Sequence, residues 1–158
     1  MNTLALPPRF NSYKLTEAIE ERGYLPAVWR SEPNETGVEE LLLQKLGPHG
    51  WGRMHHFRNF YGPGWGNGQG KPVSPRAFES MVRFLKAVQF PTPSFPSIFL
   101  TDRGGLELCW EDAIGKKVQV EFCAEGAEFY VESTGDEGVL PLTSLDALLR
   151  VISQANAS

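Results

Sequence analysis

The chain has 158 residues, of which 41% are hydrophobic and 22% charged, and its formal net charge at pH 7 is −4. This length suffices for one hydrophobic core but is short for two, so we expect a single domain over residues 1–158. The lack of any long apolar run excludes a secretory signal and a membrane span, which indicates a cytoplasmic protein without a membrane partner.

The first part of the domain, residues 1–60, is predicted to be helical and irregular. Apolar residues on one side predict a short helix over 15–22. Residues 24–30 suit an edge strand or an extended packing segment, because a proline inside this run cannot donate to a sheet ladder. Leucines recur at helical spacing over 37–46, and a Gly-Pro pair then ends that predicted helix.

The segment 47–70 holds 8 glycines in 24 residues, interleaved with aromatic and basic side chains. It is predicted to be the least regular part of the chain. We name residues 61–73, which overlap its end, the glycine–aromatic loop. Such a loop either approaches a ligand closely or wraps the surface and plugs the open side of a sheet. The residues of this segment predicted to bind a partner are Trp51, Phe57, Arg58, Tyr61 and Trp65.

The third part, residues 74–158, begins with a helix. Ser74 precedes Pro75, the preferred order of a helix cap and a first helical residue, and an apolar stripe follows. Prolines then predict a stiff extended connector over residues 90–96. Near the end of the chain, Thr143 is predicted to cap a last helix with inward leucines, after a turn over residues 135–138.

Between these helices, apolar and polar residues alternate along the chain, as in strands with one buried and one wet face. Turn residues separate the runs at 102–105, 112–115 and 125–126. The sequence therefore predicts an α+β fold, in which an antiparallel meander of about four strands near 97–133 carries helices packed on one face.

Charge is distributed unevenly along the chain. Residues 1–90 carry 11 Lys and Arg against 8 Asp and Glu, whereas residues 91–158 carry 4 against 11. The wet side of the predicted meander would present Glu107, Glu111 and Glu121. An acidic surface of this kind favours a partner protein with a basic patch, although it also simply keeps a protein in solution.

Cys109 and Cys123 fall on neighbouring predicted strands, each on the side opposite the apolar series. A contact between them across the sheet is conceivable, but reduced thiols are favoured in the cytosol. Neither has a nearby histidine or helix start that would activate it, so we expect no catalytic thiol.

Several motifs resemble those of a group of small uncharacterised bacterial proteins. They are Gly64 to Gly68, Lys71 to Ala77, and the hairpin Pro96-Ser97-Ile98 with Thr101 to Glu111. That group has a Trp-Asp-Gly-like loop, a helix started by Pro and Ser, and a hairpin of the pattern P-x-I-x-x-T-x-x-G-G-x-x-L-x-W. The resemblance covers residues 60–152, and this chain has Gly66 in place of the aspartate. Members are similar to proteins found among mobile-element, phage and defence genes, which implies a context rather than a mechanism.

Three classes of function follow from these patterns. We expect a non-catalytic module that blocks or neutralises a partner protein, of the antitoxin, immunity or phage-borne anti-defence type, without cofactor or metal. One alternative is single-stranded nucleic-acid binding, since residues 45–90 combine seven bases and many aromatic rings with one acid. A second is a small metal-dependent enzyme using His49, His55 and His56, although their spacing matches no recognised ligand motif.

Overall fold

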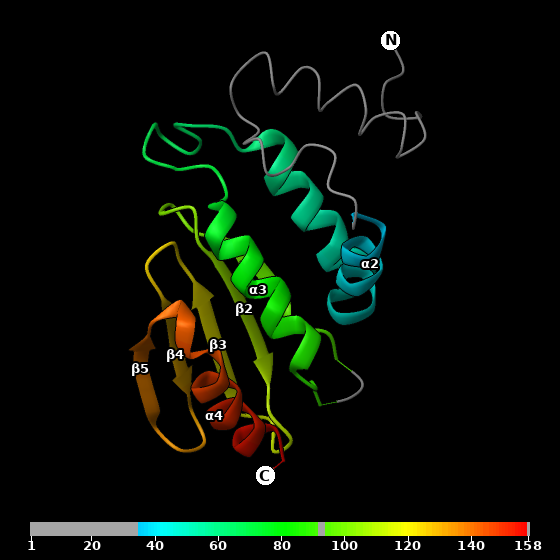
Figure 1. The fold of residues 1–158 in the computed structure, drawn as a ribbon, viewed down its shortest axis with the longest axis vertical. Coiled ribbons are helices and arrows are strands. Elements are labelled where there is room, and N and C mark those ends of the chain that lie inside the picture. Colours follow the sequence, from blue (N-terminus) through cyan, green and yellow to red (C-terminus); the bar gives the residue numbers. More distant parts are fainter. Residues whose placement is uncertain (1–34, 92–93, 158) are drawn as a thin grey trace.

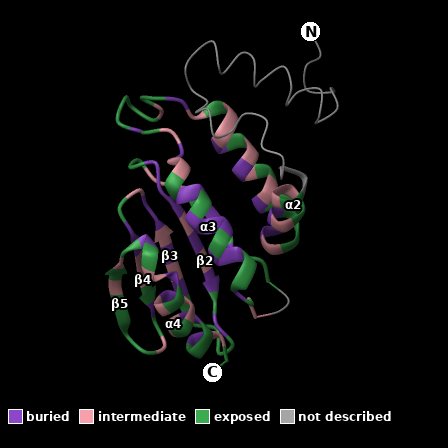
Figure 2. Cartoon of the chain, in the orientation of Figure 1, coloured by how far each residue is buried: buried purple, intermediate pink, exposed green. Residues whose placement is uncertain are grey.

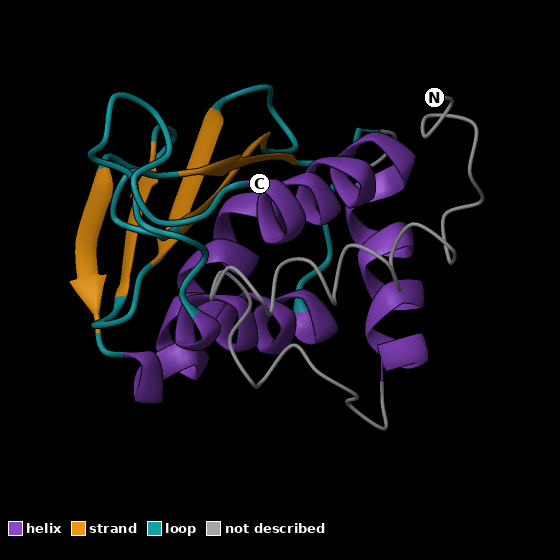
Figure 3. Cartoon of the chain, turned by 90° about the horizontal axis from the view of Figure 1, so that it is seen from above, coloured by secondary structure: helices purple, strands orange, loops and turns teal. Residues whose placement is uncertain are grey.

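The computed structural model describes residues 35–91 and 94–157, so the helix expected over 15–22 and the segment 24–30 lie outside the described residues. A five-stranded antiparallel sheet, with the strands in chain order, carries helices on one face (Figures 1 and 3). The elements are α2 (Glu35–Phe60), α3 (Pro75–Ala87), β1 (Ser97–Leu100), β2 (Leu106–Glu111), β3 (Lys117–Phe122), β4 (Ala127–Val131), β5 (Asp136–Leu140), the 3-10 turn η3 (Leu142–Ser144) and α4 (Leu145–Ala157).

The sheet confirms the α+β prediction and the alternation on which it rested. Leu108 lies opposite Val120 and Trp110 opposite Val118, and all four side chains are buried beneath the helices. The alternate positions of β2 and β3 point away from the helices and are half-buried or exposed. We call this second side of the sheet the outer face; no described helix covers it (Figure 3).

The sheet has one strand more than predicted. Residues 135–138 were expected to form a turn, but β5 begins at Asp136 and pairs with β4 along its length. Gly135 alone supplies the left-handed backbone of the turn, with a φ of 72°. The sequence Asp-Glu-Gly-Val-Leu has little strand propensity, so it was the pairing with β4 that made it a strand.

Helix α3 is built as the sequence predicts. The Ser74 hydroxyl accepts a hydrogen bond from the Ala77 N–H, 3.3 Å away, and Pro75 starts the first turn. The apolar stripe is buried, as Figure 2 shows, and α3 contacts β2, β3, α2 and α4. This helix therefore lies in the middle of the helical layer.

The start of the last helix differs from the prediction. Thr143 lies inside η3, and the extended residue before this turn is Pro141, which offers no capping side chain. Because the chain enters the 3-10 turn directly, Thr143 is not in the extended conformation that a cap needs. Leu145, Leu148 and Ile152 are nevertheless buried against the sheet, as predicted.

The largest difference concerns the segment 47–70, whose first part was predicted as loop. The chain is helical up to Phe60, and the non-helical backbone is confined to Gly47, where φ is 73° and ψ is 174°. Pro48 follows directly, a position in the first turn of a helix where its missing N–H costs nothing. The burial of Met54 and Phe57 outweighs the poor helix propensity of the glycines. Within the segment 47–70, the irregular part is the stretch after Phe60, where the glycine–aromatic loop lies.

The turn between β1 and β2 packs against the segment that precedes α3. The Lys71 N–H donates to the Asp102 carbonyl at 2.9 Å, and the Ser74 N–H donates to the Gly104 carbonyl at 2.8 Å. A Cβ atom on Gly104 would lie only 2.4 Å from the Pro72 carbonyl oxygen, and its φ is 80°. Only glycine therefore fits at this position.

The inner side of the sheet and the helices share one hydrophobic core in the described part of the chain. Both cysteines have free thiols; Cys109 is half-buried on the outer face and Cys123 is buried just after β3. None of the described helices combines the length and the apolar character needed to cross a membrane.

Candidate functional site

Three glutamates form a continuous row across the middle of the outer face. Glu107 of β2 lies opposite Glu121 of β3, which lies opposite Glu128 of β4. We call these three residues the acidic row. Phe99 of β1 and Val139 of β5 extend it to both edges of the sheet, and both side chains are exposed, Val139 to 69%. Apolar groups therefore flank the carboxylates at each end.

Carboxylates directly opposite each other on a sheet repel, so this row needs compensation. Arg103, in the turn between β1 and β2, donates from one Nη to Glu121 at 2.8 Å and also to Glu128. The Glu121 and Glu128 carboxylates raise the pKa of Arg103 above its usual range through these bonds. Thr101 donates to Glu121 at 2.9 Å, and Gln119 donates to Glu107. One guanidinium charge is thus shared by two of the three carboxylates.

A second row runs beside the acidic row and contains an exposed aromatic ring. Cys109, Gln119, Tyr130 and Glu137 follow one another from β2 to β5. The Tyr130 side chain is 38% exposed. Between the two rows lies a shallow hollow of about 170 Å³, lined by Glu107, Gln119, Glu121, Glu128, Phe129 and Tyr130.

At the end of the sheet, Glu111 is exposed and lies opposite Lys117 in the register of β2 and β3. The three glutamates predicted from the sequence therefore all lie on the outer face. Glu107 and Glu121 stand next to each other, whereas Glu111 faces a lysine. The pair of opposite charges at this end leaves the negative potential of the face concentrated at the acidic row.

The cysteines of the outer face are protonated thiols. Cys123 Sγ donates to Glu121 Oε1 at 3.3 Å, and burial together with this bond and the charge of Glu121 raises the pKa of Cys123 to about 12. Burial and the charge of Glu107 raise the pKa of Cys109 to about 11. A thiol with such a pKa is a poor nucleophile at neutral pH.

The ligand-type atoms of Glu121, Cys123 and Glu128 lie within 4.8 Å of one another. In this structure Arg103 bonds to both carboxylates, and the thiol carries its proton. A metal ion would have to displace the guanidinium and deprotonate the thiol. The arrangement is therefore built around an arginine.

The aromatic residues predicted to bind a partner lie elsewhere, in the helical layer, and contact one another there. Glu39, before the kink of α2, accepts a hydrogen bond from Trp51 Nε1 at 2.5 Å and lies 2.6 Å from His55 Nε2. Arg58 lies 3.8 Å from the same carboxylate and 5.3 Å above the Phe78 ring, with its side chain 10% exposed. Glu39 thus ties the two halves of α2 together.

Burial raises the pKa of Glu39, but several groups act in the opposite direction. The hydrogen bond and the charge of His55, then the bond from Trp51 and the charge of Arg58, lower it. The net pKa lies below the usual value for a glutamate, so this carboxylate is ionised at neutral pH. Its charge is neutralised within the protein.

A chain of ring contacts continues from α2 into the glycine–aromatic loop. Phe57 is 5% exposed and belongs to the core, and Tyr61 lies edge-on to both Phe57 and Trp65, with centroids 5.6 and 5.1 Å away. Trp65 Nε1 donates to the Lys71 carbonyl at 2.6 Å. A Cβ atom on Gly70 would lie 2.4 Å from the Trp65 ring, so the indole packs directly on that glycine. These rings hold the loop against α2.

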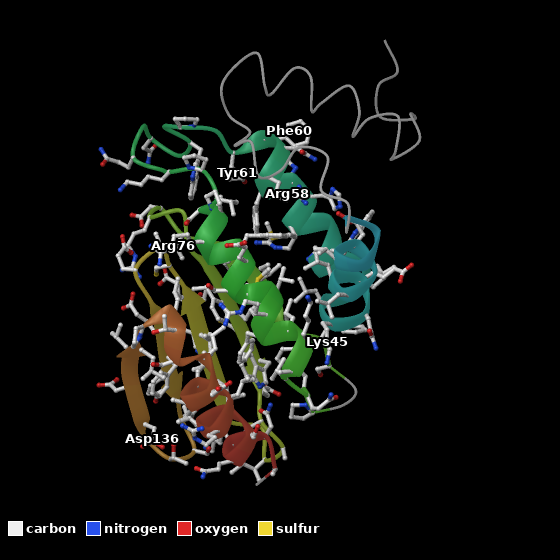
Figure 4. All side chains as sticks on the ribbon, in the orientation of Figure 1. Lys45, Arg58, Phe60, Tyr61, Arg76 and Asp136 are labelled. Carbon is white, nitrogen blue, oxygen red and sulfur yellow. The ribbon has the colours of Figure 1, made fainter. Side chains whose placement is uncertain are left out.

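Figure 4 labels Arg58, Phe60 and Tyr61 at the C-terminal end of α2, on the helical side of the sheet. The structure therefore divides the predicted partner-binding residues into two sets. Trp51, Phe57, Arg58, Tyr61 and Trp65 belong to α2 and the loop, whereas Glu107, Glu111 and Glu121 lie on the outer face. It does not bring these two sets together in one surface.

The three histidines also have separate surroundings. His49 is exposed, His55 bonds to Glu39, and His56 packs against the rings of Phe60 and Tyr61 at 5.0 and 5.3 Å. Among the described residues, the group of potential metal ligands is on the outer face instead.

Three of the seven bases of residues 45–90 have partners inside the protein. Lys45 donates to the Val88 carbonyl at 2.6 Å, Arg53 donates to the Ile98 carbonyl at 2.9 Å, and Arg58 pairs with Glu39. The bases exposed on the surface are Lys71, Arg76, Arg83 and Lys86.

The sequence analysis did not identify Arg103, Glu128, Tyr130 or Val139 as part of the outer face. The alternation of Ala-Glu-Phe-Tyr-Val in β4 carries a signal for Glu128 and Tyr130, because both stand at outward positions of that run. Arg103 lies in a turn, where no periodic pattern indicates its direction. Val139 belongs to the strand that the sequence did not predict.

Comparisons with known protein families, with curated proteins and with solved structures find no match to this chain. The resemblance to small bacterial proteins therefore stays a prediction.

Proposed function

We propose that this protein is a non-catalytic binding module whose outer face docks onto a basic surface of a partner protein. The observation that carries the proposal is the acidic row, three carboxylates side by side of which two share one guanidinium. A row of like charges lowers the stability of a sheet. Binding of a cationic partner would remove this repulsion.

The composition of the face supports a protein partner. Acidic groups accelerate association with a basic surface, while aromatic and aliphatic groups supply most of the affinity once the surfaces touch. Phe99, Tyr130 and Val139 are exposed around the acidic row and can serve as such anchors. Polar groups in the middle with apolar groups near both sheet edges fit an extended, flat contact.

The biological role we propose is neutralisation of the partner by covering its functional surface. An antitoxin, an immunity protein or a phage-borne inhibitor of host defence works in this way. The thiols of the outer face are protonated and the histidines are separated, which fits a role without chemistry. The resemblance to proteins found among mobile-element and defence genes favours the same class.

The proposal is tested by affinity purification of the tagged full chain from its own cells, followed by mass spectrometry. The test variant is Glu107→Gln with Glu128→Gln, which removes two outer-face charges and keeps the side-chain shape. The matched control is Glu40→Gln with Glu79→Gln, which changes the net charge equally at exposed helical positions. We expect one stoichiometric partner that the control retains and the test variant loses.

Equal capture by both variants, or no stoichiometric partner, would overturn the proposal. Parallel samples treated with nuclease separate it from the nucleic-acid alternative, in which capture depends on intact nucleic acid. Metal analysis of the purified chain addresses the alternative of a metal-dependent enzyme.

A further inference from the structure

A second hollow, of about 450 Å³, lies where α2, the connector 94–96 and β1 meet. Its walls are mainly apolar, with Leu46, Pro48, Phe95, Ile98 and Phe99 among the lining residues, and Arg53 is the arginine that lines it. This volume lies within the range of small-molecule sites, which are typically concave and apolar with a few placed polar groups.

The kink of α2 creates this hollow. At Gly47 the backbone leaves the helical conformation, and the second half of α2 starts in a new direction with Pro48 at the rim. The Phe95 ring packs on Gly47 so closely that a Cβ atom there would lie 2.6 Å from it. One wall of the hollow is therefore an aromatic ring held against the backbone.

Arg53 is held in place without a carboxylate. Its Nε donates to the Ile98 carbonyl at 2.9 Å, and its guanidinium carbon lies 5.2 Å from the centroids of both the Phe57 and the Phe99 rings. Within the described part of the chain, no acidic residue pairs with it, and no acidic residue lines the hollow.

The other two arginines with side-chain interactions described above do have carboxylate partners. Arg58 pairs with Glu39, and Arg103 pairs with Glu121 and Glu128. Arg53 differs from these two because it is held at an apolar hollow by a carbonyl and has no acidic partner among the described residues. A guanidinium that is partly shielded from water and has no anionic partner can bind an anionic group of a ligand.

We propose that this hollow binds a small aromatic carboxylate. The ring of the ligand lies among the apolar walls and contacts Phe95, and its carboxylate accepts hydrogen bonds from the two terminal nitrogens of Arg53. Nε continues to hold Ile98. Phe99 borders both this hollow and the outer face, but none of the acidic row lines the hollow, so the inference does not depend on the proposed protein-binding function.

The test is isothermal titration calorimetry of the full chain with a matched pair of probes, naphthalene-1-acetate and naphthalene-1-acetamide. The two share ring and shape and differ in charge. We expect the carboxylate to bind about tenfold more tightly than the amide, as for a charge-assisted bidentate contact. In Arg53→Met this preference should disappear, while binding of the amide changes little.

Two further variants keep the test decisive. Arg76→Met, which removes an exposed base on α3, should keep the full preference. Ser94→Trp changes an exposed residue that lines the hollow, and its larger side chain should weaken the binding of both probes about tenfold or more by filling the space. Because this variant retains Arg53, it also tests the site if Arg53→Met proves unfolded.

Equal affinity for the two probes would overturn the carboxylate assignment. Absence of binding by both probes at millimolar concentration, or unchanged binding in Ser94→Trp, would overturn the site itself. Loss of the preference for the carboxylate probe in Arg76→Met would show that this preference is nonspecific charge attraction.

Discussion

The kinked helix α2 and the outer face of the sheet both carry glutamates, but the charges of these glutamates are compensated to different extents. Glu39 has three partners, Trp51, His55 and Arg58, and its charge is neutralised inside the helical layer. On the outer face, three half-buried glutamates stand side by side, and two of them, Glu121 and Glu128, share Arg103. Groups already bound to one another stabilise a fold, whereas groups left without full compensation are available to a partner.

The same contrast applies to the helical residues that were predicted to bind a partner. Trp51, Phe57 and Arg58 are of the types that dominate binding surfaces, yet the structure places them in internal contacts. The five predictions that follow measure how much each region contributes to stability.

The largest effect is expected for Phe57→Ala in α2. Removal of this buried ring should lower the free energy of unfolding by about 3–5 kcal/mol, from lost burial and the cavity left behind. Urea denaturation followed by circular dichroism measures it. The control, Val139→Ser on the outer face, should change stability by less than about 0.5 kcal/mol. Similar losses in both variants would contradict the contrast.

Glu39→Gln should have the next largest effect, a loss of about 1–3 kcal/mol, because it weakens bonds from an indole, an imidazole and a guanidinium to one half-buried carboxylate. Its exposed neighbour supplies the control Glu40→Gln, which should be nearly neutral.

The same carboxylate predicts a pH dependence. The pKa of Glu39 in the folded protein lies below the usual glutamate value of 4.5, so its contribution to stability is present above about pH 4.5 and is lost as the pH falls through the folded pKa. The difference in unfolding free energy between wild type and Glu39→Gln should therefore shrink on acidification below pH 4.5. A difference that grows instead would show that the sign of this linkage is wrong.

A pair of glycine variants tests the kink and the helix beyond it. Gly47→Ala should cost about 1–2 kcal/mol, since its φ is 73° and the new methyl would lie 2.6 Å from the Phe95 ring. Gly52→Ala should stabilise by about 0.5–1 kcal/mol, because this exposed helical glycine has nothing within 4 Å of the new methyl. Thermal unfolding of both variants measures these changes in stability. If residues 48–60 were a loop, Gly52→Ala would not stabilise the protein.

The smallest effect is expected on the outer face. Glu107→Gln removes a like charge beside Glu121, so stability should stay within about 0.5 kcal/mol of wild type or rise slightly at low salt. Urea titrations at low and high salt measure the change. A loss above about 1 kcal/mol would mean that the acidic row is a structural element.

The sheet could be predicted from the sequence because alternation is a local signal with a single period. Leu106, Leu108 and Trp110 show this alternation in β2, and the capping residue Ser74 indicates the start of α3. The second half of α2 gave no such signal, since its glycines argue against a helix and only the burial of Met54 and Phe57 makes it one. Burial of this kind depends on residues far along the chain.

For the candidate site, the sequence placed Glu107, Glu111 and Glu121 on one face correctly, because strand periodicity fixes direction. It could not assemble the acidic row, which requires the register of β3 with β4, nor place Arg103, whose direction is set by a turn. The aromatic residues and the glutamates lie in separate parts of the molecule because a helix takes the place of the first part of the expected loop.

The fit of the β1–β2 turn against residues 71–74 has a consequence for binding. Arg103 stands between Asp102 and Gly104, the two residues whose carbonyls receive hydrogen bonds from that segment. Any ligand that displaces the chain ahead of α3 would therefore shift the cation that Glu121 and Glu128 share. A ligand at this segment would thereby change the electrostatic potential of the acidic row, so its binding and that of a basic partner at the outer face would be thermodynamically coupled.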